Sequence, residues 1–199
     1  MKKIILSMIC GLLLVFPAMS LAASLYGSVG VGPAWVSDSD VSVDGFFDGT
    51  AEFDTGYFVG AAVGYMREPF RLDAELSYMA SDMDTYAGFP ADAEIDALTF
   101  LANGYYDFNT GGPMKPYITA GIGASTIEIS EPGFSDEDDT VFAYQVGFGV
   151  GYELSETLIL DCRYRFMSGQ DMEFSAGGST VEVEIASHNL TVGVRIPFY

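Results

Sequence analysis

The sequence predicts an all-β protein: an eight-stranded antiparallel up-and-down transmembrane β-barrel whose N-terminal signal peptide is removed. Three observations predict it. Eight segments alternate apolar and small or polar residues with a period of two, the apolar face of each segment is continuous, and the connections between segments are alternately long and short.

The N-terminus has the pattern of a secretory signal peptide. Two lysines precede an almost uninterrupted apolar stretch from Ile4 to Phe16, and small residues follow. Cleavage after Ala22 would remove residues 1–22 and leave residues 23–199 as one barrel domain.

Two cysteines bear on processing. Cys10 lies inside the apolar stretch, whereas a lipid-modified cysteine would end such a stretch, so a lipoprotein signal is disfavoured. Cys162 alone would remain after cleavage. The mature chain is therefore expected to form no intramolecular disulfide.

Eight strands follow from the alternation. The period of two begins at Leu25 and returns seven times, and each strand is about ten residues or longer, enough for a tilted strand to cross an outer membrane. Their apolar faces run from Leu25 to Trp35, Tyr57 to Tyr65, Phe70 to Tyr78, Leu98 to Phe108, Ile118 to Ala124, Phe142 to Tyr152, Leu158 to Phe166 and Leu190 to Phe198.

The opposite faces of these strands are small or polar, as with Gly60, Ala62 and Gly64 in the second strand. We expect this inner face to be too small and too charged to form a core. A soluble barrel would have an apolar interior and a polar exterior, so the continuous apolar face requires lipid. After the signal, no stretch approaches the roughly 18 to 20 apolar residues of a spanning helix.

The connections alternate in length. Long ones follow Val36 and Ser81, and two more lie later in the chain, whereas tight turns lie at Arg67-Glu68-Pro69, around Asn109 to Pro116, and near Ser155. In outer-membrane barrels the long loops are external and the short turns periplasmic. Four external loops are therefore expected.

Negative charge is concentrated in these loops. Of the 28 acidic residues, 21 lie in or beside the four long connections, with no basic residue among them. This charge argues against nucleic acid and favours divalent cations or basic extracellular ligands. Asp38-Ser39-Asp40 and the run from Asp136 to Asp139 lack the spacing of a calcium-binding loop, so no metal site and no cofactor are expected.

A second set of charges faces inward. They alternate with the apolar residues of the strands, which places four arginines and four carboxylates in the lumen: Arg71, Asp73, Glu75, Asp107, Asp161, Arg163, Arg165 and Arg195. An isolated charge there would be costly, whereas a paired one is tolerable, so we predict a network of ion pairs that plugs the lumen. The alternatives are a conduction or proton path and acid–base catalysis; the matched signs favour pairing.

Several segments resemble the outer-membrane β-barrel domain family that includes opacity-like porins and the small OmpA/OmpX-type barrels. They are R-x-D-x-E-x-S-Y from Arg71 to Tyr78, N-G-Y-Y-D-F from Asn103 to Phe108, K-P-Y-I-T-A-G-I-G-A from Lys115 to Ala124, and H-N-L-T-V-G-V-R-I-P-F-Y from His188 to Tyr199.

The resemblance implies an outer-membrane location in contact with lipid and lipopolysaccharide. It also implies that the barrel assembly machinery recognises a terminal aromatic, here Phe198 or Tyr199. Family members include adhesins, surface antigens, envelope stabilisers and narrow channels, so the fold alone does not fix the function.

The leading hypothesis is a non-enzymatic barrel whose acidic loops serve envelope structure or surface interaction and adhesion. The alternative is a narrow porin-like channel for ions or small solutes. A lipid A-modifying enzyme is a third hypothesis. Barrel-embedded lipid A deacylases use a His-x-Ser pair, whereas this chain has Ser187-His188-Asn189, which is the wrong spacing.

Overall fold

The computed structural model describes residues 24–37, 39–43, 47–86, 89–130, 137–169, 172–176, 179–183 and 186–198. Twelve strands lie within these ranges. They are β1 (Ser24–Val36), β2 (Ser39–Val43), β3 (Phe47–Phe53), β4 (Gly56–Arg67), β5 (Phe70–Tyr86), β6 (Phe89–Asp107), β7 (Met114–Ser130), β8 (Glu137–Ser155), β9 (Leu158–Gly169), β10 (Met172–Ala176), β11 (Ser179–Val183) and β12 (Ala186–Phe198).

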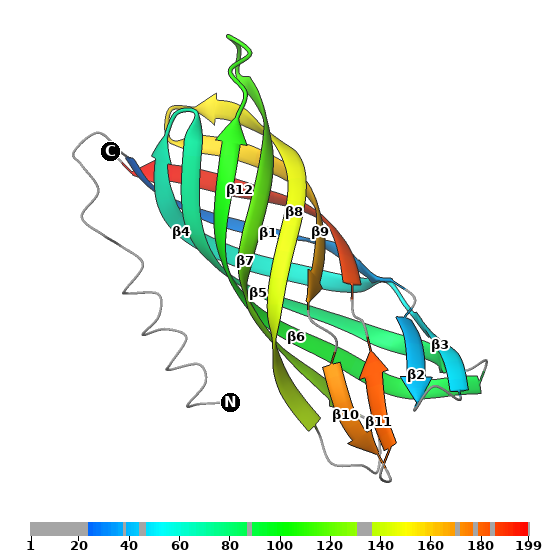
Figure 1. Cartoon of the computed structure of the whole chain (residues 1–199). Coiled ribbons are helices and arrows are strands. Elements are labelled where there is room, and N and C mark those ends of the chain that lie inside the picture. The colour runs from blue at the N-terminus through cyan, green and yellow to red at the C-terminus, as the bar shows by residue number, and fades with distance from the viewer. Residues whose placement is uncertain are drawn as a thin grey trace.

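Eight of these strands close a barrel (Figure 1). Each pairs antiparallel with the next in the order β1, β4, β5, β6, β7, β8, β9 and β12, and β12 pairs with β1 to complete the circle. All eight contain a segment whose alternation predicted a strand. The predicted eight-stranded antiparallel barrel is therefore confirmed.

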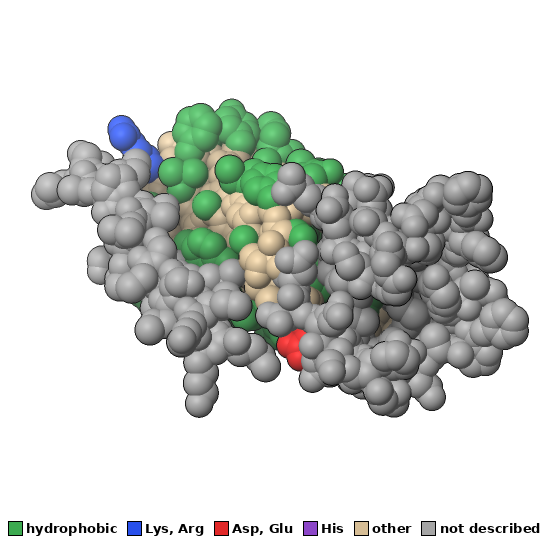
Figure 2. All heavy atoms as spheres, turned by 60° about the horizontal axis from the view of Figure 1, so that its bottom comes forward, with side chains coloured by type: hydrophobic (Ala, Val, Ile, Leu, Met, Phe, Trp, Pro, Cys, Tyr) green, Lys and Arg blue, Asp and Glu red, His purple; other side chains and the backbone are tan. Residues whose placement is uncertain are grey.

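The alternation sorts side chains between the lipid face and the lumen. Val29, Ile122 and Phe148 are each more than half exposed on the outside, whereas Tyr26 and Phe58 point inward and are completely buried. Hydrophobic side chains predominate over the described part of the surface drawn in Figure 2. No helix in the described ranges is both long enough and apolar enough to cross a membrane.

The two ends of the barrel differ, and we name them by their structure. The turn end carries the short connections β4–β5, β6–β7 and β8–β9 together with Phe198, the last described residue. The extended end lies opposite, where β5, β6, β7 and β8 continue beyond the barrel wall and the short strands β2, β3, β10 and β11 are added (Figure 1).

The extended end corrects the prediction of four long loops. β3 pairs with β5, β2 with β3, β11 with β2 and β10 with β11, so much of the predicted loop sequence is strand. β5 and β6 also stay paired as far as Tyr86 and Phe89. Pairing satisfies the backbone N–H and C=O groups, and the acidic residues do not prevent it.

The lumen contains an apolar layer on the side of the extended end, where the sequence predicted no core. Its buried residues are Ala34, Val36, Phe58, Met79, Ile95, Ala97, Leu101, Ile127, Ala143 and Met167. The expectation of an inner face without a core is therefore wrong for this half of the barrel. Glycines and charged residues occupy the inward positions of the other half, so the sequence of each strand does not indicate an apolar core.

A closed barrel of this kind makes a prediction for gel electrophoresis. Unboiled protein in detergent should migrate differently from boiled protein, because the closed hydrogen-bonded sheet resists unfolding until it is heated. The measurement is a gel of boiled and unboiled samples beside a circular dichroism spectrum, which should be rich in β structure. A single mobility before and after boiling would contradict the closed barrel.

Candidate functional site

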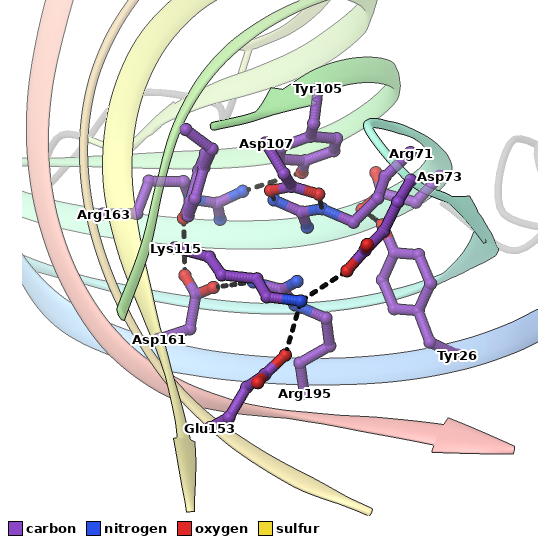
Figure 3. Close-up of polar contacts among 12 residues, drawn as sticks. Tyr26, Arg71, Asp73, Tyr105, Asp107, Lys115, Glu153, Asp161, Arg163 and Arg195 are labelled. Carbon is purple, nitrogen blue, oxygen red and sulfur yellow. Dashed lines mark hydrogen bonds and ion pairs between the residues drawn. The ribbon is translucent and has the colours of Figure 1, made fainter. Parts of the chain in front are cut away.

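The candidate site is the charged half of the lumen, next to the turn end (Figure 3). β5, β6, β9 and β12 supply the eight predicted charges. All of them lie at inward positions, because they occupy alternate residues between lipid-facing apolar ones. The structure brings all eight into contact with polar partners in the barrel.

Arg71 and Asp107 form a bidentate pair between the neighbouring strands β5 and β6. Arg71 Nε donates to Asp107 Oδ2 at 2.7 Å and Nη2 donates to Oδ1 at 2.9 Å. The guanidinium also lies over the rings of Tyr105 and Tyr117, at 4.1 and 4.7 Å from their centroids. Two parallel hydrogen bonds and two aromatic faces hold this cation in one orientation.

Glu75 accepts from two arginines of β9. Arg163 Nη2 donates to Oε2 at 2.9 Å, and Arg165 Nη1 donates to Oε1. β5 and β9 are not neighbours in the sheet, so these bonds cross the lumen. Glu75 and Arg165 are buried, and the Arg165 guanidinium lies 4.0 Å from the centroid of the Phe58 ring.

Asp161 lies on the other side of the charged layer. Its Oδ2 accepts from Arg195 of β12, and its Oδ1 accepts from the hydroxyl of Tyr117. Tyr105 completes the layer, because its hydroxyl accepts from Arg163 Nη1 at 3.1 Å. Two inward tyrosines thus connect ion pairs that lie on separate strands.

Asp73 departs from the expected matching of four arginines with four carboxylates. It accepts from the Tyr26 hydroxyl at 2.7 Å and from Asn103 Nδ2 at 2.9 Å, while Glu75 takes two arginines. Asn103 Oδ1 in turn accepts from Gln145 Nε2 at 2.6 Å. A chain of neutral groups from β1, β6 and β8 therefore stabilises the Asp73 carboxylate.

The Asp73 arrangement carries a stability prediction. Asp73→Ala would leave the buried Tyr26 hydroxyl and one Asn103 N–H without their acceptor, and each orphaned group should cost about 1–3 kcal/mol. Urea unfolding in detergent, followed through the fluorescence of Trp35, measures the loss. An unfolding midpoint equal to that of the unchanged protein would contradict the assigned bonds.

Lys115 connects the three turns and was missed in the sequence. Its Nζ bonds Glu68 of the β4–β5 turn and Glu153 near the end of β8, the latter at 2.7 Å (Figure 3). The Glu153 N–H also donates to the carbonyl of Pro113 at 2.9 Å. The available signal in the sequence was a lysine beside the β6–β7 turn, with glutamates beside the β4–β5 and β8–β9 turns.

The charged half leaves little free space. One cavity of about 30 Å³ is lined by Arg71, Asp73, Glu75 and Arg163, among other residues. Within the described ranges, no group of three or more His, Cys, Asp or Glu side chains could hold a metal ion. The volume suits water and not a larger ligand, as expected for an eight-stranded barrel filled by side chains.

His188 lies on the outer wall. Its Nδ1 is 2.6 Å from the hydroxyl oxygen of Tyr164, and its ring packs against Phe166 at 5.2 Å between centroids. Ser187 is buried on the opposite face of β12. Because neighbouring residues of a strand point to opposite faces, Ser187 is not placed to act with His188.

Several predicted features fall wholly or partly outside the described residues. These are the signal peptide at residues 1–22, with Cys10, the terminal Tyr199, and the acidic residues Asp38 and Asp136. Phe198 is described: it pairs with Leu25 of β1 and is 52% exposed on the outer wall. Its role as an assembly signal stays a prediction.

Two curated proteins are similar to this chain in sequence. Outer membrane protein PagN of Salmonella typhimurium is 24% identical over 171 residues, which cover 70% of this chain and 72% of PagN. Major surface antigen 4 of Anaplasma marginale is 28% identical over 181 residues, covering 76% of this chain and 61% of that protein, so this chain spans less than two thirds of it.

The crystal structure of Neisserial surface protein A is similar in fold. It superposes with a TM-score of 0.61 at 22% identity, covering 88% of this chain and 99% of that one. The family model described as outer membrane protein beta-barrel domain matches residues 8–198. Together with the closed barrel and its apolar outer wall, this match establishes that the chain belongs to the outer membrane protein β-barrel domain family and is an outer-membrane protein.

Proposed function

We propose that the protein is a non-enzymatic surface barrel with a plugged lumen, and that its acidic extended end serves surface interaction or envelope structure. One observation carries this proposal: the basic residues are confined to the lumen and the turn end, whereas acidic residues also occupy the extended end. Every basic residue after the predicted signal lies in the lumen or at the turn end: Arg67, Arg71, Lys115, Arg163, Arg165 and Arg195.

The extended end therefore presents acidic residues without compensating cations. Asp54 and Asp82 are exposed there, and Glu128 is half-buried. Such a surface repels phosphate groups and attracts cations, so it would contact lipopolysaccharide through divalent ions or bind basic ligands directly. The names of two similar proteins, a major surface antigen and a surface protein, support a surface role.

Calcium-dependent contact with lipopolysaccharide tests the proposal. Proteoliposomes holding the barrel should cluster with lipopolysaccharide vesicles when calcium is added and disperse with a chelator. The triple variant Asp54→Asn, Asp82→Asn, Glu128→Gln should cluster less. Glu68→Gln with Glu156→Gln at the turn end is the control and should not. Equal clustering by all three proteins, or none, would remove the support for a calcium-bridged contact.

The absence of enzymatic activity rests on the placement of His188. Its ring lies on the outer wall beside the Tyr164 hydroxyl, on the face of β12 opposite the buried Ser187. Overproduction should leave the mass spectrum of lipid A unchanged. A new lipid A species that disappears with His188→Ala would replace this part of the proposal.

A narrow channel is the second candidate, favoured by the charge-lined cavity in the lumen. Planar-bilayer recording distinguishes it from a plug. Protein with a plugged lumen should pass no resolvable current, and Arg163→Gln with Arg165→Gln serves as the comparison. High conductance by the unchanged protein would make the channel the better function.

Export and assembly complete the proposal. Removal of residues 1–22 would release the barrel, and the assembly machinery would read Phe198 or Tyr199. Deletion of Tyr199, followed by measurement of the inserted fraction, tests which aromatic is read. Insertion unchanged by this deletion but lost with Phe198→Ala would assign the signal to Phe198.

A further inference from the structure

Inward side chains change from charged to apolar along the barrel axis. This change marks a boundary in the lumen between the charged half and the apolar layer. Along β5, Arg71, Asp73 and Glu75 precede Ser77 and Met79 on the way from the turn end to the extended end. Along β9, Asp161, Arg163 and Arg165 precede Met167. Arg165 is thus the last charge on β9 before the apolar layer.

Polar atoms at this boundary lack partners. Arg165 Nε and Nη2, Gln145 Oε1 and Asn189 Oδ1 are all buried without a hydrogen bond. Asn189 is directly opposite Arg165 in the β9–β12 register, and Gln145 is opposite Met167, the next inward residue of β9, in the β8–β9 register. The three residues therefore come from three neighbouring strands at the boundary between the charged half and the apolar layer.

The three residues are chemically complementary through water. Arg165 offers two N–H donors, whereas Gln145 and Asn189 each offer an amide oxygen as acceptor. A water molecule can accept from the first and donate to the others, and buried waters usually make about three such bonds. Just below, on the turn-end side, the cavity of about 30 Å³ is lined by Glu75, Arg163 and Thr191, so the charged half has polar room for water.

The apolar layer above this boundary has the opposite character. Phe58 and Leu101 are completely buried, and Met79 and Met167 are 3% and 7% exposed. A cavity of about 30 Å³ lies beside the two methionines, lined mainly by Ala97, Ile127 and other apolar residues, with three serines. One of these serines, Ser125, is bonded to Thr99 at 2.8 Å.

We propose that the lumen binds ordered water at Arg165, Gln145 and Asn189, and that the apolar layer, not the layer of ion pairs, closes the barrel. Charged groups can be solvated while they stay paired, whereas an apolar constriction excludes water and with it the ions that water carries. The charged half is then a hydrated pocket on the turn-end side of the apolar layer. Its lining is polar, but its free volume is too small for anything larger than water.

Water-contact NMR of the unchanged protein in lipid bilayers tests the hydrated part. Magnetisation transferred from water should reach the guanidinium of Arg165 and the amide of Gln145, and should not reach the methyl groups of Met79 and Met167. Met114, which is exposed at the turn end, is the internal control for a methyl group near water. Water contact at Met79 and Met167, or a dry Arg165, would overturn the proposal.

Conductance of three variants tests the seal. Met79→Ser with Met167→Ser would make the layer polar and wider, so the current across a planar bilayer should rise several-fold. Arg163→Gln should leave it at the level of the unchanged protein, as should Met114→Ser on the outside of the barrel. If Arg163→Gln raised the current and the double serine variant did not, the ion pairs would be the seal.

Discussion

Glu75→Ala is expected to destabilise the barrel by about 3–5 kcal/mol, the range for a buried ion pair that loses one partner. Glu75 is the acceptor for both Arg163 and Arg165, and all three side chains lie in the lumen. Removing the carboxylate leaves two cations without their counter-ion. Arg165 suffers most, because its guanidinium is fully buried and Glu75 is its one hydrogen-bond acceptor among the described residues, whereas Arg163 also donates to Tyr105.

Urea unfolding of the variant in detergent, followed by Trp35 fluorescence, measures this loss. Glu68→Ala is the matched control, because Glu68 also pairs with a cation but its side chain is 61% exposed. An exposed pair contributes about 0–1 kcal/mol, so the control should unfold close to the unchanged protein. Equal losses in the two variants would show that the lumen pairs are as weakly coupled as those at the surface.

Ile122→Arg is expected to cost about 2–4 kcal/mol, the range for a cation on the lipid face at the middle of the membrane. Ile122 lies in the middle of β7, is 60% exposed on the apolar outer wall, and has Ala102 and Tyr144 as cross-strand neighbours. A guanidinium there would lie in hydrocarbon, far from both ends of the strand.

Met114→Arg provides the comparison on the same strand and the same face. Met114 is the first residue of β7, at the turn end, where a long cation can reach the headgroup region. The expected loss there is about 0–1 kcal/mol. Folding into bilayers over a range of urea concentrations measures the stability of both variants. If Met114→Arg lowered the free energy of unfolding as much as Ile122→Arg, the membrane position assigned to these two residues would be wrong.

The sequence predicted the wall of the barrel well because a strand in lipid is constrained on every second residue. The strand beginning at Leu25 and the strand ending at Phe198 follow that rule throughout, and Arg71 and Glu75, which alternate with lipid-facing residues, are buried. Parity states which face a side chain occupies. It does not state which side chain on another strand it meets.

The pairing in the lumen illustrates this limit. Glu75 binds arginines 88 and 90 residues away, across the barrel, because strand tilt and stagger set which levels coincide. Asp73, only two residues from Glu75, meets Tyr26 and Asn103 instead of an arginine. No spacing along the chain contains that information.

The apolar layer was missed for a different reason. Phe58 and Met79 stand alone among small or polar inward neighbours on their own strands, so neither strand looks like part of a core. Only closure of the barrel places them beside Ile95 and Ile127. The strands of the extended end were missed because they are short and lack a continuous apolar face.

The bonds from Glu75 to β9 also bear on how the barrel is completed. A sheet that contains β1 to β8 but lacks β9 would hold Glu75 without Arg163 and Arg165, and Asp161, the acceptor for Arg195, lies on the same missing strand. The unfinished sheet is therefore electrostatically incomplete, whereas one late strand supplies three charges at once. A sheet that closed without β9 would leave Glu75 unpaired, so these ion pairs favour closure of the complete eight-stranded barrel over closure of a smaller one.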